Sequence, residues 1–264
     1  IHEGVYDYDK MKDDIFPYMI SSNDYFSHLI STFSWGKLFR KEIYTDIQNN
    51  VPNHISLGED AAVTYKYLLN CKKIFILNKS VSFYRQRASS ILKTFSSNKK
   101  EIAKIFELYN FLSDNLPTTN FNIEAQLQEY IMYLICVRTG SFFDKKIINE
   151  SIYGQKISKA DRIGIISSGA FGQKLYNNLK ENKYDVIGWF DKDSYESNLS
   201  GLNVHSLEEL DRFEFDSLII ASLNNEYVSK IKNDYGFHKK KMIYPKSLKN
   251  LSSKIFNELF INHG

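Results

Sequence analysis

Two adjacent carboxylates directly before a helical pattern are the residues best suited to chemistry in this sequence. Glu59 and Asp60 follow Gly58 and precede the amphipathic run 61–69, which predicts a helix. Paired carboxylates are the residue types that general acid–base reactions use. Acidic residues are also common at helix starts, where they cap backbone N–H groups and meet the positive end of the helix dipole. The spacing alone leaves catalysis and helix capping open as interpretations.

Aromatic and basic residues precede this pair. Trp35, Lys37 and Arg40 lie in the stretch 33–44, which predicts a helix, and they would also fit one face of an ordinary amphipathic helix. The order of three motifs resembles the latter half of the bacterial family 2 glycosyltransferases, which have the GT-A fold, over about residues 1–95. The motifs that carry this resemblance are Ser34–Lys41, Ile55–Asp60, and Ser82–Arg87 followed by Ser90 and Ile91.

The resemblance implies an inverting transfer of a sugar from a nucleotide diphosphate donor to an acceptor hydroxyl. This chemistry needs a carboxylate that takes the hydroxyl proton as the new bond forms. By resemblance, Asp60 is that base, and Glu59 orients the acceptor or supports Asp60. Arg85 or Lys37 would stabilise the charge on the departing diphosphate. The expected substrate-binding aromatic residues, which could stack on a sugar ring or pack in the core, are Trp35 and Tyr84.

Enzymes of this family also hold Mg²⁺ or Mn²⁺ at an Asp-x-Asp site that precedes these motifs. Two such strings occur here, Asp7–Asp9 and Asp191–Asp193. The first fits a turn and helix start, and the second follows the Glu-Asp pair, which reverses the family order. We therefore assign neither, and the resemblance implies metal ligands ahead of Ile1. On this hypothesis the chain is part of a longer enzyme and is itself inactive in sugar transfer.

A different pattern follows residue 159. Ile163–Ile166 predicts a strand that leads into a turn similar to the dinucleotide fingerprint G-x-G-x-x-G, in which Gly169 and Gly172 match and Ser167 replaces the first glycine. Such a turn lets a phosphate reach the N–H groups of a helix N-terminus. Asp191 ends the next predicted strand, where a ribose-binding acid would stand. NAD or another nucleotide could bind here, and the alternative is a turn that only packs a helix on a sheet.

The stretch of about 160–247 resembles the small Rossmann-like domains that accompany sugar-modifying enzymes of polysaccharide synthesis. No obvious catalytic Ser/His pair follows the fingerprint, so we expect no dehydrogenase activity. Two functions are therefore compatible with the sequence. The first is a glycosyltransferase of surface-polysaccharide assembly, and the second is a module that binds a nucleotide or nucleotide sugar, or docks a protein, without catalysis.

The pattern of elements predicts an α/β protein in three parts. Residues 1–95 form the partial GT-A domain, 96–158 a helical connector, and 159–264 a Rossmann-like domain with a parallel sheet. The other predicted elements are strands over 73–77, 80–85, 186–190 and 218–221, and helices on both sides of Pro117 and over 145–153, 173–182 and 206–210.

Composition narrows the classes of protein further. Of 264 residues, 43% are hydrophobic and 25% charged, which is typical of a globular chain. The net charge of +3 gives no reason to expect a nucleic-acid partner. No apolar run approaches the roughly 20 residues that span a bilayer, and two cysteines are too few for a disulfide framework. We expect a cytoplasmic protein, or one peripheral to the inner face of the membrane, whose partners are a nucleotide-sugar donor and a glycan or lipid-linked acceptor.

Overall fold

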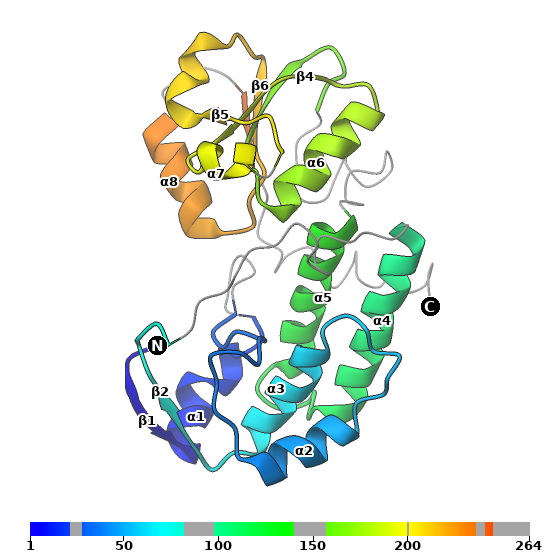
Figure 1. Cartoon of the computed structure of the whole chain (residues 1–264), viewed down its shortest axis with the longest axis vertical. Coiled ribbons are helices and arrows are strands. Elements are labelled where there is room, and N and C mark those ends of the chain that lie inside the picture. The colour runs from blue at the N-terminus through cyan, green and yellow to red at the C-terminus, as the bar shows by residue number, and fades with distance from the viewer. Residues whose placement is uncertain (22–27, 82–97, 140–156, 200, 236–240, 245–264) are drawn as a thin grey trace. The chain divides into compact units, whose positions relative to one another are not determined.

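The structure is a computed structural model that describes residues 1–21, 28–81, 98–139, 157–199, 201–235 and 241–244. The described chain divides within one helix into two compact units, the first ending at Met132 and the second starting at Tyr133. Figure 1 labels most of the elements of both. No helix in the described part is both long and apolar enough to cross a membrane.

The first unit contains a small antiparallel sheet. Strand β1 (Gly4–Asp7) pairs with β2 (Lys73–Ile76), so the beginning of the chain lies beside a segment some 70 residues later (Figure 1). Strand β2 confirms the strand predicted over 73–77. Val5 and Phe75 lie opposite each other on the exposed face of this sheet.

Asp7 ends β1 and starts helix α1 (Tyr8–Asp14). Its carboxylate accepts a hydrogen bond from the backbone N–H of Lys10 at 3.1 Å and so caps the helix. The string Asp7–Asp9 is therefore a helix start, as the sequence predicts. A 3-10 turn, η1 (Phe16–Tyr18), follows.

Helix α3 (Glu59–Asn70) lies at the centre of the first unit. Seven of its 12 residues are buried, because α2 (Lys41–Asn49) and α4 (Asn98–Asn115) both pack against it (Figure 1). This helix confirms the prediction over 61–69.

Gly58 fixes the point at which α3 begins. Its φ of 75° lies in the left-handed region, where a side chain is strained. A Cβ at this position would also lie 2.4 Å from Cδ2 of Leu108 in α4. The glycine allows α4 to approach closely. The start of α3 that it fixes sets the direction in which the side chains of Glu59 and Asp60 point.

The helix predicted over 33–44 is wrong in its first part. Residues 33–40 form no regular structure, and α2 starts only at Lys41. Gly36 has a φ of 78°, which is incompatible with a right-handed helix. The alternative placement of Trp35, Lys37 and Arg40 on one helical face is therefore wrong as well.

The helices predicted on both sides of Pro117 are confirmed as α4 and α5 (Ile123–Thr139). Residues 80 and 81, the first two of the strand predicted over 80–85, are not in a strand. The rest of that strand, and the helix predicted over 145–153, lie outside the described residues.

One buried amide ties the start of the chain to α5. Gln126 is 4% exposed, and its Oε1 accepts from the backbone N–H groups of Ile20 at 2.9 Å and Ser21 at 3.3 Å. Its Nε2 donates to the carbonyl groups of Phe16 at 3.0 Å and Phe121 at 2.8 Å. The whole hydrogen-bonding capacity of this side chain is thus used on backbone groups.

The second unit contains a five-stranded parallel sheet with the strand order β5-β4-β3-β6-β7. This confirms the predicted parallel sheet and is consistent with a Rossmann-like α/β fold. The GT-A fold of the first unit stays a prediction. The elements are β3 (Arg162–Ile166), α6 (Ala170–Glu181), β4 (Asp185–Asp191), α7 (Ser194–Leu199), β5 (His205–Ser206), η4 (Leu207–Arg212), β6 (Ser217–Ile220), α8 (Asn225–Tyr235) and β7 (Lys241–Ile243).

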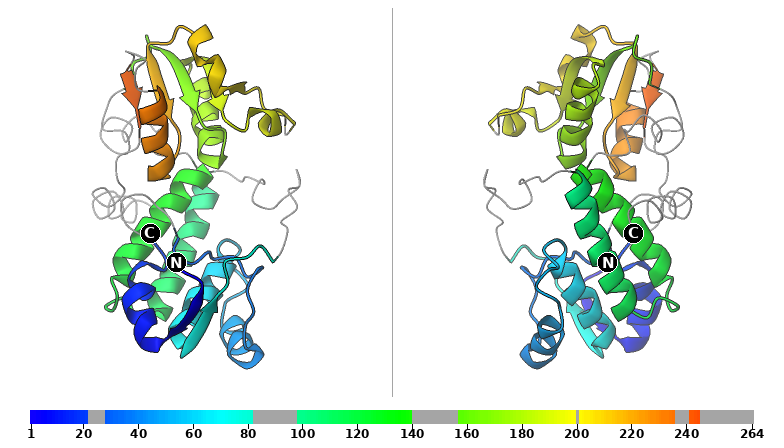
Figure 2. Two further views of the ribbon diagram at one scale, coloured as in Figure 1. Left: turned by 90° about the vertical axis from the view of Figure 1, so that its left-hand side faces the viewer. Right: turned by 90° about the vertical axis from the view of Figure 1, so that its right-hand side faces the viewer.

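Both faces of this sheet are covered (Figure 2). Trp189 of β4 stacks on Tyr176 of α6, with ring centroids 4.5 Å apart, so α6 covers that face. The adjacent residue Phe190 points to the opposite face and belongs to a buried cluster with Val228 and Ile231 of α8. Burial on both faces explains why the strands appear in the sequence as short continuous apolar runs.

Candidate functional site

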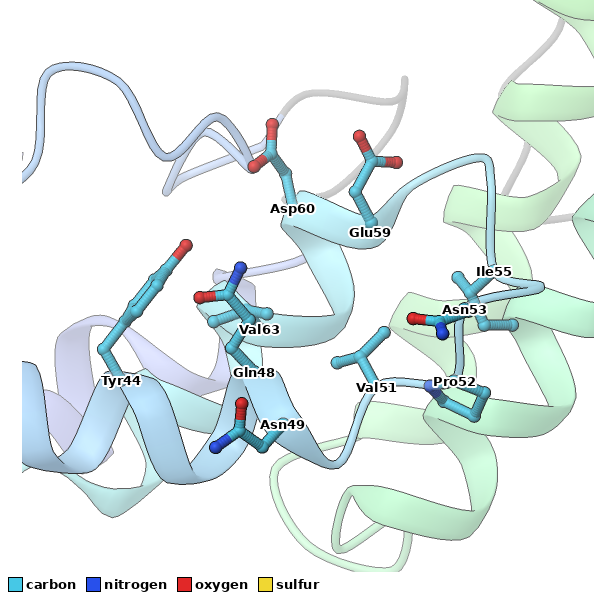
Figure 3. A pocket seen from close by; sticks show the side chains of 10 residues that line it. All are labelled: Tyr44, Gln48, Asn49, Val51, Pro52, Asn53, Ile55, Glu59, Asp60 and Val63. Atoms are coloured by element: carbon cyan, nitrogen blue, oxygen red, sulfur yellow. The ribbon is translucent and has the colours of Figure 1, made fainter.

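Glu59 and Asp60 lie in the first turn of α3 and line an open pocket of about 460 Å³. Figure 3 shows this pocket between α2, α3 and the loop that joins them. The cap residue of α3 is Gly58, which makes no side-chain hydrogen bond to the helix. Neither carboxylate is the cap residue of α3, so helix capping does not explain the pair.

The lining of the pocket is mainly polar. Among the described residues, no lysine or arginine lines it. Amide groups donate and accept, and carboxylates accept, so such a wall can hydrogen-bond hydroxyl groups in either direction. A phosphate would meet two carboxylates without a cation, which is unfavourable. The polar residues of the wall are Tyr44, Gln48, Asn49, Asn53, Glu59 and Asp60.

Ser34 holds one oxygen of Asp60. Its Oγ donates to Asp60 Oδ1 at 2.8 Å, across 26 positions of sequence. The ammonium group of Lys37 donates to the carbonyl of Phe33 and lies near enough to Asp60 for the two charges to interact. Burial lowers the pKa of Lys37, and the charge of Asp60 opposes this effect. The structure therefore brings together Asp60 and Lys37, two of the predicted site residues.

The irregular segment before α2, which we call the anchored loop (residues 32–40), is fixed to α3 at three points. Thr64 Oγ1 donates to the carbonyl of Thr32 at 2.9 Å, and the backbone N–H of Arg40 donates to Tyr67 Oη at 2.7 Å. The serine–carboxylate bond described above is the third. The loop thus has a defined conformation without being a helix.

Trp35, the predicted aromatic residue that the structure describes, lies outside the lining of the pocket. Trp35 stacks on Phe33, with ring centroids 5.0 Å apart and planes at 20°, and it is 47% exposed, so it is not a core residue. Tyr84 and Arg85 lie outside the described residues, and their predicted roles stay predictions.

Sequence reasoning missed the polar wall opposite the carboxylates. Ser34 lies in the motif Ser34–Lys41, whose resemblance implies no role for it, and no motif includes the amides Gln48, Asn49 and Asn53. The signal that could have identified them is a polar run with amide side chains that ends a few residues before Gly58.

The metal implied by the resemblance has no fitting set of donors in the described part of the chain. There, no group of three or more His, Cys, Asp or Glu residues could hold an ion. Asp7 caps a helix, Asp9 pairs with Lys12 at 3.8 Å, and Asp191 is 7% exposed with its oxygens already hydrogen-bonded. No step proposed below uses a metal held by these carboxylates.

The turn between β3 and α6 has the predicted order of strand, turn and helix. A Cβ at Gly172 would lie 2.0 Å from the carbonyl oxygen of Ser167, so only glycine lets α6 pack on the turn. At Gly169, which has a φ of −62°, a Cβ would meet nothing nearer than 3.8 Å. Ser167 has a φ of 88° and so keeps the backbone conformation that the first glycine of the fingerprint would favour.

Asp191 fastens the end of β4 to this turn. Its Oδ2 accepts from the Oγ of Ser168 at 2.7 Å and from the backbone N–H of the same residue. Its Oδ1 accepts from the N–H of Asp193 at 3.1 Å, and Ser168 Oγ also bonds to Ser197 Oγ at 2.6 Å. A ribose diol would have to replace these bonds. The geometry accounts for Asp191 without a ligand, and its role in nucleotide binding stays a prediction.

Comparison with known proteins gives one local similarity. Residues 159–243 match the family described as C2185-like, N-terminal, a span that runs from just before β3 to the end of β7. None of the curated proteins and none of the solved structures compared with the chain matches it. The similarity therefore concerns the second unit and starts where the sequence places its C-terminal domain.

Proposed function

We propose that the first unit holds the acceptor and the general base of an inverting glycosyltransferase of surface-polysaccharide assembly. The observation that carries the proposal is the position of Asp60. It lines the polar pocket, and Ser34 holds its Oδ1, while its Oδ2 accepts no hydrogen bond from the described residues. A carboxylate fixed through one oxygen, with the other available, suits a group that takes a proton from a bound hydroxyl.

The chemistry follows from this arrangement. A sugar of the acceptor lies in the pocket, where the amides of Gln48, Asn49 and Asn53 hydrogen-bond its hydroxyl groups. The reacting hydroxyl donates its proton to Asp60 as its oxygen bonds to the anomeric carbon of the donor sugar. The bond from that carbon to the diphosphate breaks on the opposite face, so the configuration inverts. The charge of Lys37 offsets part of the negative charge that develops nearby.

Nucleotide binding by the second unit has weaker support as a second function. Its support is Gly169, where a Cβ would meet only the Oγ of Ser167, at 3.8 Å, so this turn is not closely packed at the position that a phosphate would approach. Gly172 and Asp191, however, are both explained by contacts within the protein. We therefore propose that the second unit is an accessory domain of the transferase.

The proposal is tested with the complete gene product. Nucleotide sugars are first screened for donor hydrolysis and transfer with Mn²⁺ present, by chromatography of the released nucleotide. Asp60→Asn, which keeps the size of the side chain and removes its basicity, should lower kcat by about 10²–10⁴-fold. Asp46→Asn, on the exposed part of α2 outside the pocket, is the matched control and should retain activity. A folded Asp60→Asn enzyme with normal turnover would exclude Asp60 as the base.

A further inference from the structure

Apolar side chains protrude from the anchored loop. Leu38 is fully exposed, Trp35 is 47% exposed and Phe33 is 41% exposed. The rings of Phe33 and Trp35 stack on each other with their planes at 20°. Because three hydrogen bonds fix the loop to α3, this exposure belongs to a defined backbone conformation and not to a loosely held chain.

Basic residues accompany these apolar side chains. Residues 31–41 contain three basic residues and no acidic one. Lys37 turns back toward Asp60, whereas Arg40 and Lys41 are exposed. Tryptophan prefers the headgroup level of a bilayer, leucine and phenylalanine enter the acyl boundary, and lysine and arginine bind anionic headgroups. Residues 31–41, which are the anchored loop and the residue on each side of it, thus combine all three kinds of side chain.

A protein partner fits this surface less well than a membrane does. Stable protein interfaces bury about 800 Å² on each partner, usually as a broad face. Three side chains that stand out from one short loop offer much less than this. Shallow insertion also leaves the loop backbone at the level of water and headgroups, where its N–H and C=O groups can still be hydrogen-bonded.

We propose that the anchored loop inserts Phe33, Trp35 and Leu38 into the surface of an anionic bilayer. In the sequence, Ser34 lies between Phe33 and Trp35, whose rings stack, and its hydroxyl group donates to Asp60. Insertion of these rings therefore brings the carboxylate to the membrane surface. Resting on the proposed function, this assigns the class of acceptor. The hydroxyl that reaches Asp60 belongs to a sugar carried on a lipid anchor in that bilayer, and not to a soluble glycan.

Vesicle binding of the purified chain tests the insertion. Sucrose-loaded vesicles of phosphatidylglycerol and phosphatidylethanolamine are sedimented with the protein, and phosphatidylcholine vesicles serve as the neutral comparison. The double variant Trp35→Ser with Leu38→Ser should lower the partition coefficient by at least about ten-fold. The matched control, Val5→Ser with Phe75→Ser, removes a similarly exposed apolar pair from β1 and β2 and should bind as the wild type does.

The charge contribution is tested separately. Arg40→Gln with Lys41→Gln should weaken binding to the anionic vesicles by about five-fold for each cation removed, and should leave binding to phosphatidylcholine unchanged. The backbone N–H of Arg40 keeps its bond to Tyr67 in this variant, so the loop conformation is preserved.

Tryptophan fluorescence gives a second measurement on the wild-type chain. The protein has two tryptophans, and Trp189 is only 4% exposed, so a change in emission on adding vesicles reports on Trp35. Brominated lipids should quench this emission. If the double variant Trp35→Ser with Leu38→Ser fails to fold, this measurement on the wild type shows whether the loop enters the bilayer.

Three outcomes would overturn the insertion. They are no sedimentation of the wild type with anionic vesicles, an equal loss in the control pair, or loop-dependent self-association in sedimentation velocity without vesicle binding. The assay needs neither donor nor turnover, and Asp60→Asn should bind vesicles normally. Failure of the loop is therefore distinguishable from failure of Asp60 as the base.

Discussion

Replacing Gly172 by alanine tests whether the glycine turn of the second unit is required by packing alone. The added Cβ would lie 2.0 Å from the carbonyl oxygen and 2.9 Å from the carbonyl carbon of Ser167. Both atoms belong to the backbone, so no side-chain rotation relieves the contact, and α6 has to move away from β3. Overpacking of a buried site costs about 1–3 kcal/mol, and we expect the upper part of this range because α6 also carries the stack of Tyr176 on Trp189.

The matched control is Gly169→Ala. Its φ of −62° suits alanine, and the nearest atom to a Cβ is 3.8 Å away, so the stability should be unchanged or higher by about 0.5 kcal/mol. With Trp35 replaced by phenylalanine in every variant, urea unfolding followed by the emission of Trp189 reports on the second unit, because this ring is buried in it. If Gly172→Ala unfolds within experimental error of the wild type, the packing explanation of this glycine is refuted.

Three further results are expected. If the proposed transferase activity is found, Ser34→Ala should lower its kcat by roughly ten-fold, because Asp60 loses the bond that holds it. Ser34→Thr should restore part of the rate, and equal rates in the wild type and Ser34→Ala would contradict the positioning role. Ser167→Gly should raise the free energy of unfolding, measured in urea, by about 1 kcal/mol, because a φ of 88° is strained for serine and not for glycine. A free energy of unfolding below that of the wild type would contradict this. Burial lowers the pKa of His28 to about 4, so its neutral form is favoured in the folded state. Stability should then fall by about 3 kcal/mol between pH 6.5 and 4, and urea titrations of His28→Asn over this range should show a smaller loss.

The parallel sheet of the second unit could be predicted from the sequence because each strand is a short apolar run that a turn ends. Ile163–Ile166 and the strand that ends at Asp191 are buried on both faces, and this produces continuous runs instead of alternation. The helix predicted over 33–44 failed for a local reason. One glycine with positive φ interrupts it, and the loop then makes its hydrogen bonds with residues of α3 that lie 26 to 32 positions later in the chain.

The candidate site could be predicted only in part. The pair Glu59 and Asp60 stands out because two acidic residues follow a glycine at a helix start. The amide wall does not, since Gln48, Asn49 and Asn53 look like ordinary surface residues of a helix end and loop. They line a pocket only because the loop after α2 folds back beside α3. Periodicity and motif spacing contain no information on such a closure.

The bonds of Gln126 impose an order of events on synthesis. Its partners at the start of the chain, the backbone groups of Phe16, Ile20 and Ser21, lie 105 to 110 positions earlier. At about 5–20 residues per second, a ribosome needs roughly 5–20 s to make the intervening chain. Throughout that interval the backbone groups of Phe16, Ile20 and Ser21 have water as their partner. The first residues to be made in this unit are therefore among the last to reach their final contacts.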